Sequence, residues 1–136
     1  MPAVFIVILL ASAFGLWRRR TDGRVRSVTD GEDASPFAAF GTLGSRATIV
    51  QFSSAVCAPC RATKAIARDV AATVPGVTHI EIDAERHLDL VRAHGIMRTP
   101  TVLVLDGRGR LSARIAGVPK RDDLIEALDD RRFENL

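Results

Sequence analysis

The only two cysteines of the chain, Cys57 and Cys60, are separated by two residues and lie between segments of different secondary-structure pattern. Residues 47–53 carry β-branched side chains and predict a strand, whereas residues 59–74 carry Ala, Ile and Val at helical spacing and predict a helix. Two thiols at a helix start can close a local disulfide, and the helix N-terminus favours the thiolate of the first one. The sequence therefore predicts a dithiol that exchanges with disulfides.

Two other uses of a cysteine pair have less support. A structural disulfide would close a loop of only four residues here, and the chain-entropy gain from a cross-link grows with loop length. A structural zinc site normally needs four ligands, and His79, His87 and His94 form no compact motif with the cysteines. We therefore expect no metal site.

A proline begins a further predicted strand, because Thr99-Pro100-Thr101 leads directly into the apolar residues 102–105. Proline is tolerated at this position because it donates no ladder hydrogen bond. A cis bond would leave neighbouring backbone groups free to pair with an extended peptide, although an ordinary trans proline is the commoner form.

Together these features resemble the thioredoxin family, over about residues 46–133. The resemblance rests on Cys-x-x-Cys after a strand, Ile82-Asp83 at the end of the next strand, Thr99-Pro100-Thr101, and Gly117 between a hairpin and the last helix. It implies an α/β thioredoxin fold, with a mixed central sheet flanked by helices. It also implies that the Thr99–Pro100 bond is cis and that Pro100 lies beside Cys57.

The resemblance implies a protein-disulfide reductase that uses no cofactor of its own. Cys57, at the exposed helix start, is the expected nucleophile and Cys60 the expected resolving thiol. The expected partners are protein disulfide substrates and a thioredoxin reductase or another dithiol electron donor. A thioredoxin-fold binding module and a redox sensor with little turnover are the alternatives. Besides Pro100 and the cysteines, the expected substrate-binding residues are Val56, Ala58, Pro59, Thr99 and Gly117.

The chain departs from the usual family pattern at four positions. Gln51 stands where thioredoxins bury an aspartate beneath the second cysteine, and His79 stands where they usually have a lysine. Imidazole titrates near neutral pH, so Gln51 and His79 mark the expected place of proton handling. Val56 and Ser53 replace two tryptophans, which predicts a different substrate preference.

The remaining pattern alternates strands and helices, as a mixed sheet covered by helices requires. Val25 to Thr29 is the one weak candidate for the first strand of the family. Ser35 and Pro36 suit the start of a short helix, and Asp106-Gly107-Arg108-Gly109 is typical of a hairpin turn. The other expected elements are strands 77–83, 101–105 and 111–116, and helices 86–94 and 122–132.

Residues 1–17 contain no charged side chain and are just long enough to span a bilayer. A membrane anchor, a cleaved signal peptide and a buried core helix are the three interpretations. Ala11-Ser12-Ala13 could serve as a cleavage site, but no basic side chain precedes the apolar core as it does in signal peptides. The sequence therefore favours a single-pass anchor in contact with membrane lipid.

Five arginines lie between residues 18 and 26, directly after the apolar segment. Cytoplasmic flanks collect Lys and Arg, so we expect the domain in the cytoplasm, with export as the alternative. A basic cluster can also bind nucleic acid, but its place beside an apolar segment favours a topology signal, and no nucleic-acid partner is expected. Composition thus divides the chain into a transmembrane anchor (1–17), a basic flank with a linker and short helix (18–45), and a thioredoxin-like domain (46–136).

Overall fold

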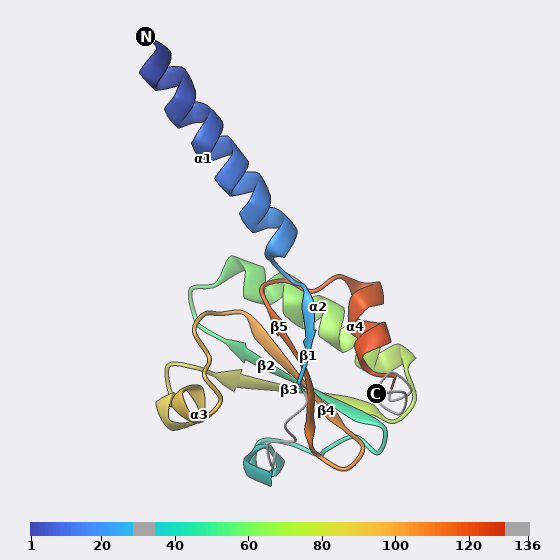
Figure 1. Ribbon diagram of the computed structural model, residues 1–136. Helices are drawn as coiled ribbons and strands as arrows, with labels where there is room; N and C mark the ends of the chain where they lie inside the picture. The colour runs from blue at the N-terminus through green and yellow to red at the C-terminus, as the bar shows by residue number, and fades with distance from the viewer. Residues whose placement is uncertain (29–34, 130–136) are drawn as a thin grey trace.

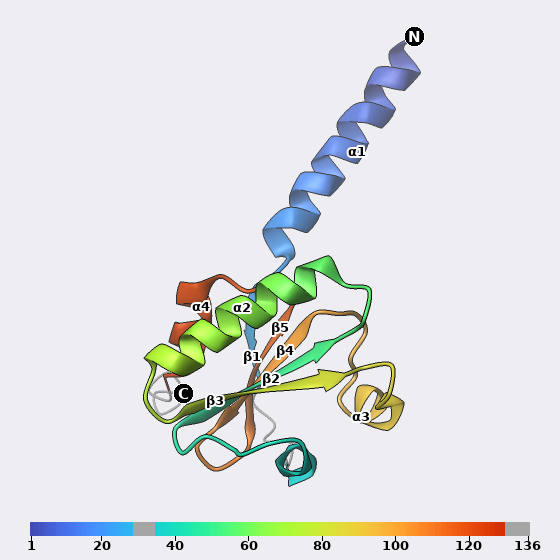
Figure 2. The same cartoon turned by 180° about the vertical axis from the view of Figure 1, so that it is seen from behind.

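The computed structural model describes residues 1–28 and 35–129, and in it a long N-terminal helix projects away from a domain built on a five-stranded sheet (Figure 1). Helices cover both faces of the sheet, and Figure 2 shows α2 lying across one face with α4 beside it. The elements are α1 (Pro2–Thr21), β1 (Val25–Ser27), η1 (Ser35–Ala39), β2 (Ala47–Ser53), α2 (Ala58–Thr73), β3 (Val77–Asp83), α3 (Leu88–Ala93), β4 (Thr101–Asp106), β5 (Leu111–Ala116) and α4 (Arg121–Ala127).

The strands follow the order β1-β5-β4-β2-β3. Strands β2 and β3 are parallel, and the other neighbours are antiparallel. The mixed central sheet flanked by helices that the sequence predicts is therefore confirmed. Every residue of β2 is buried, because this strand lies inside the sheet and both of its faces are covered by helices.

The two faces of the sheet build two separate cores, since successive side chains of a strand point to opposite faces. Helices α2 and α4 cover one core, and α3 and η1 cover the other. The first contains Ala47, Ile49, Ala67, Val70, Val77, Val102, Val104, Ala113, Ile115, Leu124, Ala127 and Leu128. The second contains Phe37, Val50, Phe52, Ile80, Ile82, Leu90, Ile96, Leu103, Leu105 and Leu111.

The sheet and the second core both extend into residues 18–45, which the sequence assigns to the flank, linker and short helix. Strand β1 pairs antiparallel with β5, with Val25 opposite Ile115. Phe37 of η1 is only 1% exposed and meets the ring of Phe52 edge-on, with ring centroids 6.1 Å apart. Only three residues separate α1 from β1, so no long linker joins the N-terminal helix to the sheet.

Helix α1 is the one helix, among the described residues, that is long and apolar enough to cross a membrane. It continues past residue 17 through Arg18, Arg19 and Arg20 to Thr21. None of its residues is buried, so it is not a core helix of this domain.

Local sequence signals explain how several elements end. Gly95, at φ +59°, follows α3, which is shorter than the predicted helix 86–94. In the predicted hairpin turn, the Asp106 carboxylate accepts hydrogen bonds from the backbone N–H groups of Arg108 and Arg110, both at 2.9 Å. The predicted last helix begins one residue earlier than expected and ends at Ala127, and residues 130–132 of that prediction lie outside the described part of the chain.

Candidate active site

The cysteine pair lies in the loop after β2 and at the start of α2. Cys57 is the N-cap residue of α2 and forms a disulfide with Cys60, with the two Cα atoms 5.2 Å apart. Pro59 lies in the first turn, where a missing N–H leaves no helical hydrogen bond unmade. The strand-to-helix junction predicted from the sequence thus brings both sulfurs to one end of the sheet.

The two cysteines differ in their surroundings. Cys60 is 4% exposed, whereas Cys57 is partly exposed. The backbone N–H of Cys60 donates a hydrogen bond to Cys57 Sγ at 3.2 Å. In the reduced protein, a donor at this place and the positive end of the helix favour a thiolate at Cys57.

Gln51 lies beneath the second cysteine and is completely buried. Its Nε2 donates to the carbonyl oxygen of Cys60 at 2.9 Å, and its Oε1 lies 3.1 Å from Nε2 of His79. A carbonyl oxygen only accepts, so the Gln51 amide nitrogen must face Cys60 and the amide oxygen must face His79. His79 therefore carries its proton on Nε2 and donates it to Gln51.

Burial lowers the pKa of His79 below its ordinary value of 6.5, because desolvation disfavours the imidazolium. Glu81 opposes this shift of the pKa, and Arg68 and Lys64 add to it. Since His79 is thereby held neutral at pH 7, it is a hydrogen-bond donor to Gln51 and not a buried cation.

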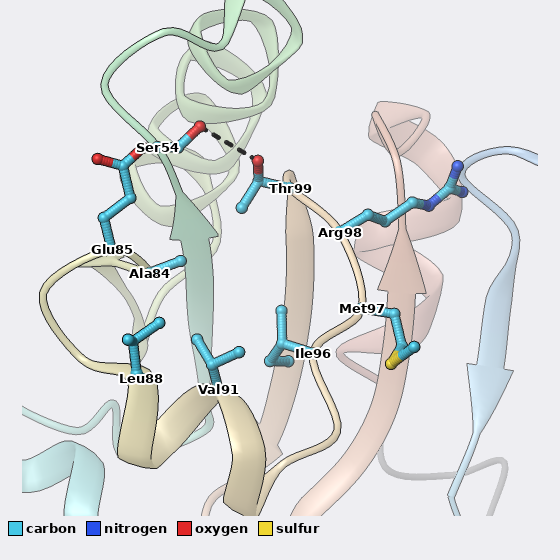
Figure 3. Close-up of a pocket in the computed structure, with 9 residues that line it drawn as sticks. All are labelled: Ser54, Ala84, Glu85, Leu88, Val91, Ile96, Met97, Arg98 and Thr99. Carbon is cyan, nitrogen blue, oxygen red and sulfur yellow. Dashed lines mark hydrogen bonds between the residues drawn. The ribbon is translucent and has the colours of Figure 1, made fainter.

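The loop before β4 comes to the same end of the sheet as the cysteines. The Thr99–Pro100 peptide bond is cis, as the resemblance implies. The hydroxyl oxygens of Ser54 and Thr99 lie 3.3 Å apart, which joins the loop before Cys57 to the residue before Pro100 (Figure 3). The carbonyl oxygen of Pro100 accepts a hydrogen bond from the backbone N–H of Gly117 at 2.8 Å.

The predicted substrate-binding residues fall into two groups. Val56, Ala58 and Pro59 are exposed around Cys57, and Val56 is 96% exposed. Thr99 is partly buried by its contact with Ser54, and Gly117 is buried. A Cβ on Gly117 would lie 3.2 Å from the backbone nitrogen of Gly23 and 3.3 Å from the Asp22 carboxyl carbon, so the segment after α1 covers this glycine.

Two hollows adjoin the site. Figure 3 shows the larger one, about 280 Å³, between α3 and the loop before Pro100. It is lined by Ser54, Ala84, Glu85, Leu88, Val91, Ile96, Met97, Arg98 and Thr99. The smaller one, about 110 Å³, lies beside the disulfide. Its lining residues are Ser53, Ser54, Ala55, Cys57, Cys60, Arg61, Lys64 and Glu81.

Glu81 is a residue of this site that the sequence does not single out. It lines the hollow beside the cysteines and forms an ion pair of 3.3 Å with Lys64. Glu81 pairs with Gln51 in the parallel β2–β3 register, so the two side chains lie on the same face of the sheet. The sequence signal that could have identified Glu81 is its position two residues after His79 in a predicted strand, which puts both side chains on the same face.

Within residues 1–28 and 35–129, no three His, Cys, Asp or Glu side chains are grouped as a metal site would require.

The geometry agrees with comparisons against known proteins. The family model Thioredoxin matches residues 34–130. A mutant thioredoxin from Halobacterium salinarum NRC-1 is 19% identical, with 62% of this chain and 73% of that chain covered and a TM-score of 0.57. Thioredoxin f from spinach chloroplast is 21% identical, with 74% and 90% covered and a TM-score of 0.59.

Thioredoxin NaTrxh from Nicotiana alata is 25% identical, with 67% of this chain and 76% of that chain covered and a TM-score of 0.55. No curated protein sequence matches the chain. At these low identities, the structural likeness shows a shared fold and nothing more specific. The family match covers most of the chain and includes both cysteines and the cis proline, and therefore the chain belongs to the thioredoxin family.

Proposed function

We propose that this protein is a membrane-anchored reductase of protein disulfides, with its domain in the cytoplasm. The thioredoxin domain and its cysteine pair support thiol–disulfide oxidoreductase chemistry. The observation that carries the proposal is the unequal exposure of the two cysteines. Cys57 can be reached from solvent and receives the Cys60 N–H, whereas Cys60 is 4% exposed.

The reaction proceeds in two exchange steps. The Cys57 thiolate attacks one sulfur of the substrate disulfide, which forms a mixed disulfide and releases the other substrate sulfur as a thiolate. Cys60 then loses its proton and attacks Cys57 Sγ, which forms the Cys57–Cys60 disulfide and releases the second substrate thiolate. The substrate gains two electrons, and a dithiol partner such as a thioredoxin reductase returns two electrons to the cysteine pair.

The second step needs a route for the Cys60 proton. Gln51 carries an amide, which does not titrate, so it positions the Cys60 backbone through its 2.9 Å hydrogen bond. The titratable group of this pair is His79, whose Nε2 already donates to Gln51, so its neutral imidazole can accept a proton only at Nδ1. In this proposal His79 handles the proton and Gln51 holds both partners in place.

The proposed function also includes a binding place for the substrate peptide and a position at the membrane. An extended peptide is held between the exposed residues around Cys57 (Val56, Ala58 and Pro59) and the backbone at Thr99, and the buried Gly117 supports this loop through its hydrogen bond to Pro100. Helix α1 anchors the protein in the lipid bilayer in this proposal, and the arginines at its end favour the cytoplasmic side for the domain. A cytoplasmic reductant pool then supplies the electrons.

Serine substitution of each cysteine tests the proposal. The Cys57→Ser full chain in detergent is expected to lose insulin-disulfide reduction, because it has no nucleophile. The Cys60→Ser protein is expected to accumulate mixed disulfides, because the resolving attack is missing, and gel shifts reversed by dithiothreitol would detect them. Full activity of the Cys57→Ser protein would contradict the assigned roles.

A binding module that uses its cysteines little is the second candidate. The observation in its favour is Gln51, which puts a group without acid–base chemistry in a completely buried place beneath Cys60. A redox sensor whose disulfide state changes a partner contact is a narrower form of it. A partner complex that forms equally well with the wild type and the Cys57→Ser/Cys60→Ser double variant, together with negligible insulin reduction by the wild type, would favour the module.

A further inference from the structure

The anchor helix joins the domain at the end of the sheet that carries the active site. After α1 ends at Thr21, only Asp22, Gly23 and Arg24 precede β1. The backbone N–H of Gly23 donates to the carbonyl oxygen of Ala116, the last residue of β5, at 2.8 Å. Figures 1 and 2 show the start of α2 and the base of α1 at the same end of the domain.

An ion pair connects the base of α1 to the loop before the cis proline. Arg98 Nη2 lies 2.6 Å from Asp22 Oδ1 and also donates to the carbonyl oxygen of Ala116 at 3.0 Å. Figure 3 shows the Arg98 side chain pointing from the Thr99 loop toward the N-terminal segment. Since Arg98 is two residues before Pro100, the helix base and the substrate loop are direct neighbours.

Backbone packing fixes the direction in which α1 leaves the domain. Gly23 is buried at φ +75°, and a Cβ there would lie 2.2 Å from the carbonyl oxygen of Val118, so only glycine fits. Strand β1 then holds the chain in the sheet through its pairing with β5. An exposed ion pair alone contributes little rigidity, but here it adds to a connection that has no slack.

The connection also sets the height of the site above a bilayer. Arginines at the end of an apolar helix lie at the level of the lipid headgroups. Asp22 follows Arg18 by four residues, which corresponds to about 6 Å of helix. The base of α1, the loop that carries Arg98 and the cysteine pair therefore all lie on the membrane side of the domain.

We propose that the active site faces the surface of the membrane that holds α1, and that its substrates are disulfides of proteins at that surface. This inference rests on the proposed reductase function and narrows its substrate class. A disulfide near the bilayer reaches Cys57 directly, whereas a disulfide held far above the bilayer is beyond the reach of a domain without a flexible linker.

Reconstitution of the full chain in nanodiscs tests the proposal, because both faces of the bilayer are accessible there. Two lipid-anchored peptides carry the same fluorogenic disulfide, one directly beside the anchor and one on a helical spacer of about 30 residues, about 45 Å long. The pre-reduced protein is mixed with each peptide, and the single-turnover rate is recorded. Soluble insulin, added to the same nanodiscs, measures the basal reductase activity.

A variant with a Gly-Ser insert of about 65 residues between Thr21 and Asp22 gives the domain a reach of about 45 Å, which matches the spacer, while keeping the Asp22–Arg98 pair. The same insert appended after Leu136 is the matched control. We expect the wild type and the control to reduce the near peptide at least about tenfold faster than the far one, and the insertion variant to differ less than about twofold.

The rates on the two peptides and on insulin distinguish a wrong orientation of the active site from a wrong reductase function. Insulin reduction with equal rates on the near and far peptides in the wild type would overturn the orientation alone. A preference that survives the insertion between Thr21 and Asp22 would overturn it as well, because the rigid connection would then not be its cause. Absence of reduction of insulin and of both peptides would overturn the reductase function and the inference with it.

Discussion

His79 donates a hydrogen bond of 3.1 Å to the side-chain oxygen of Gln51, and Gln51 donates in turn to the backbone of Cys60. This chain of contacts occupies the place where thioredoxins usually bury a carboxyl group. The amide nitrogen and the amide oxygen of Gln51 each have a hydrogen-bond partner, and this arrangement puts no charge beneath the disulfide. Under the proposed function, the two tasks are separate, with Gln51 positioning the Cys60 backbone and His79 handling the proton.

Gln51→Glu is expected to speed the release of substrate from the mixed disulfide and to reduce stability. A glutamate is nearly isosteric and can accept the Cys60 proton, but burying a carboxyl without a full set of partners costs about 1 to 3 kcal/mol in the free energy of unfolding. Stopped-flow measurement of the resolving step and urea denaturation check both effects. Gln51→Met, which removes the hydrogen bonds without adding an acid, is the control, and a Glu variant no faster than the Met variant would reject proton transfer as the limit.

His79→Gln is expected to flatten the pH dependence of stability below pH 6.5. The folded-state pKa of His79 is lowered by burial, so the unfolded state binds more protons between that pKa and about 6.5. The stabilisation is therefore fully present above about pH 6.5 and is lost as the pH falls through the folded-state pKa. Denaturation curves at several pH values measure it, with His87→Gln as the control. Parallel curves for the wild type and His79→Gln would contradict the assignment.

Phe37→Ala is expected to lower the free energy of unfolding by about 3 to 5 kcal/mol, because it leaves a cavity next to Phe52 and His94. Phe40 is the matched control, since it lies three residues later and is 38% exposed. Phe40→Ala is expected to cost less than about 1 kcal/mol. If urea denaturation gives Phe37→Ala a cost as small as that of Phe40→Ala, the domain does not need Phe37 for its stability.

The reduction potential of the Cys57–Cys60 pair is expected to lie near that of thioredoxins, about −270 mV, because a reductase must donate electrons to substrate disulfides of higher potential. Equilibration of the full chain in glutathione buffers, followed by thiol alkylation, measures it. A value near the oxidising end of the family range, about −120 mV, would point to an exported oxidant and reverse the proposed topology.

Local signals in the sequence predict most of the fold. The β-branched residues of β2, the turn residues from Asp106 to Gly109 and the helical spacing after Cys60 act within a few residues, so each is visible without knowledge of the whole chain. Strand β1 gives only a weak signal, because a three-residue edge strand with Arg26 and Ser27 exposed shows no apolar alternation. Its place in the sheet depends on β5, at the other end of the sequence.

The site was predictable to a similar degree. The spacing of Cys57 and Cys60 indicates the chemistry, and the resemblance to a family implies the cis proline. The contact between Gln51 and His79 depends on the register of two parallel strands, in which Gln51 lies opposite Glu81. The pair of Asp22 and Arg98 joins residues that are 76 positions apart. No local pattern encodes such contacts, because tertiary packing decides them.

The pairing of Val25 with Ile115 also determines the stage of synthesis at which the sheet can be completed. Helix α1 leaves the ribosome before β5, and under the proposed anchoring it enters the bilayer before β5 is available to pair. Strand β1 then stays unpaired close to the membrane until the β4–β5 hairpin has been synthesised and β5 can pair with it. Under the proposed anchoring, the pairing of β1 with β5 therefore takes place at the membrane surface.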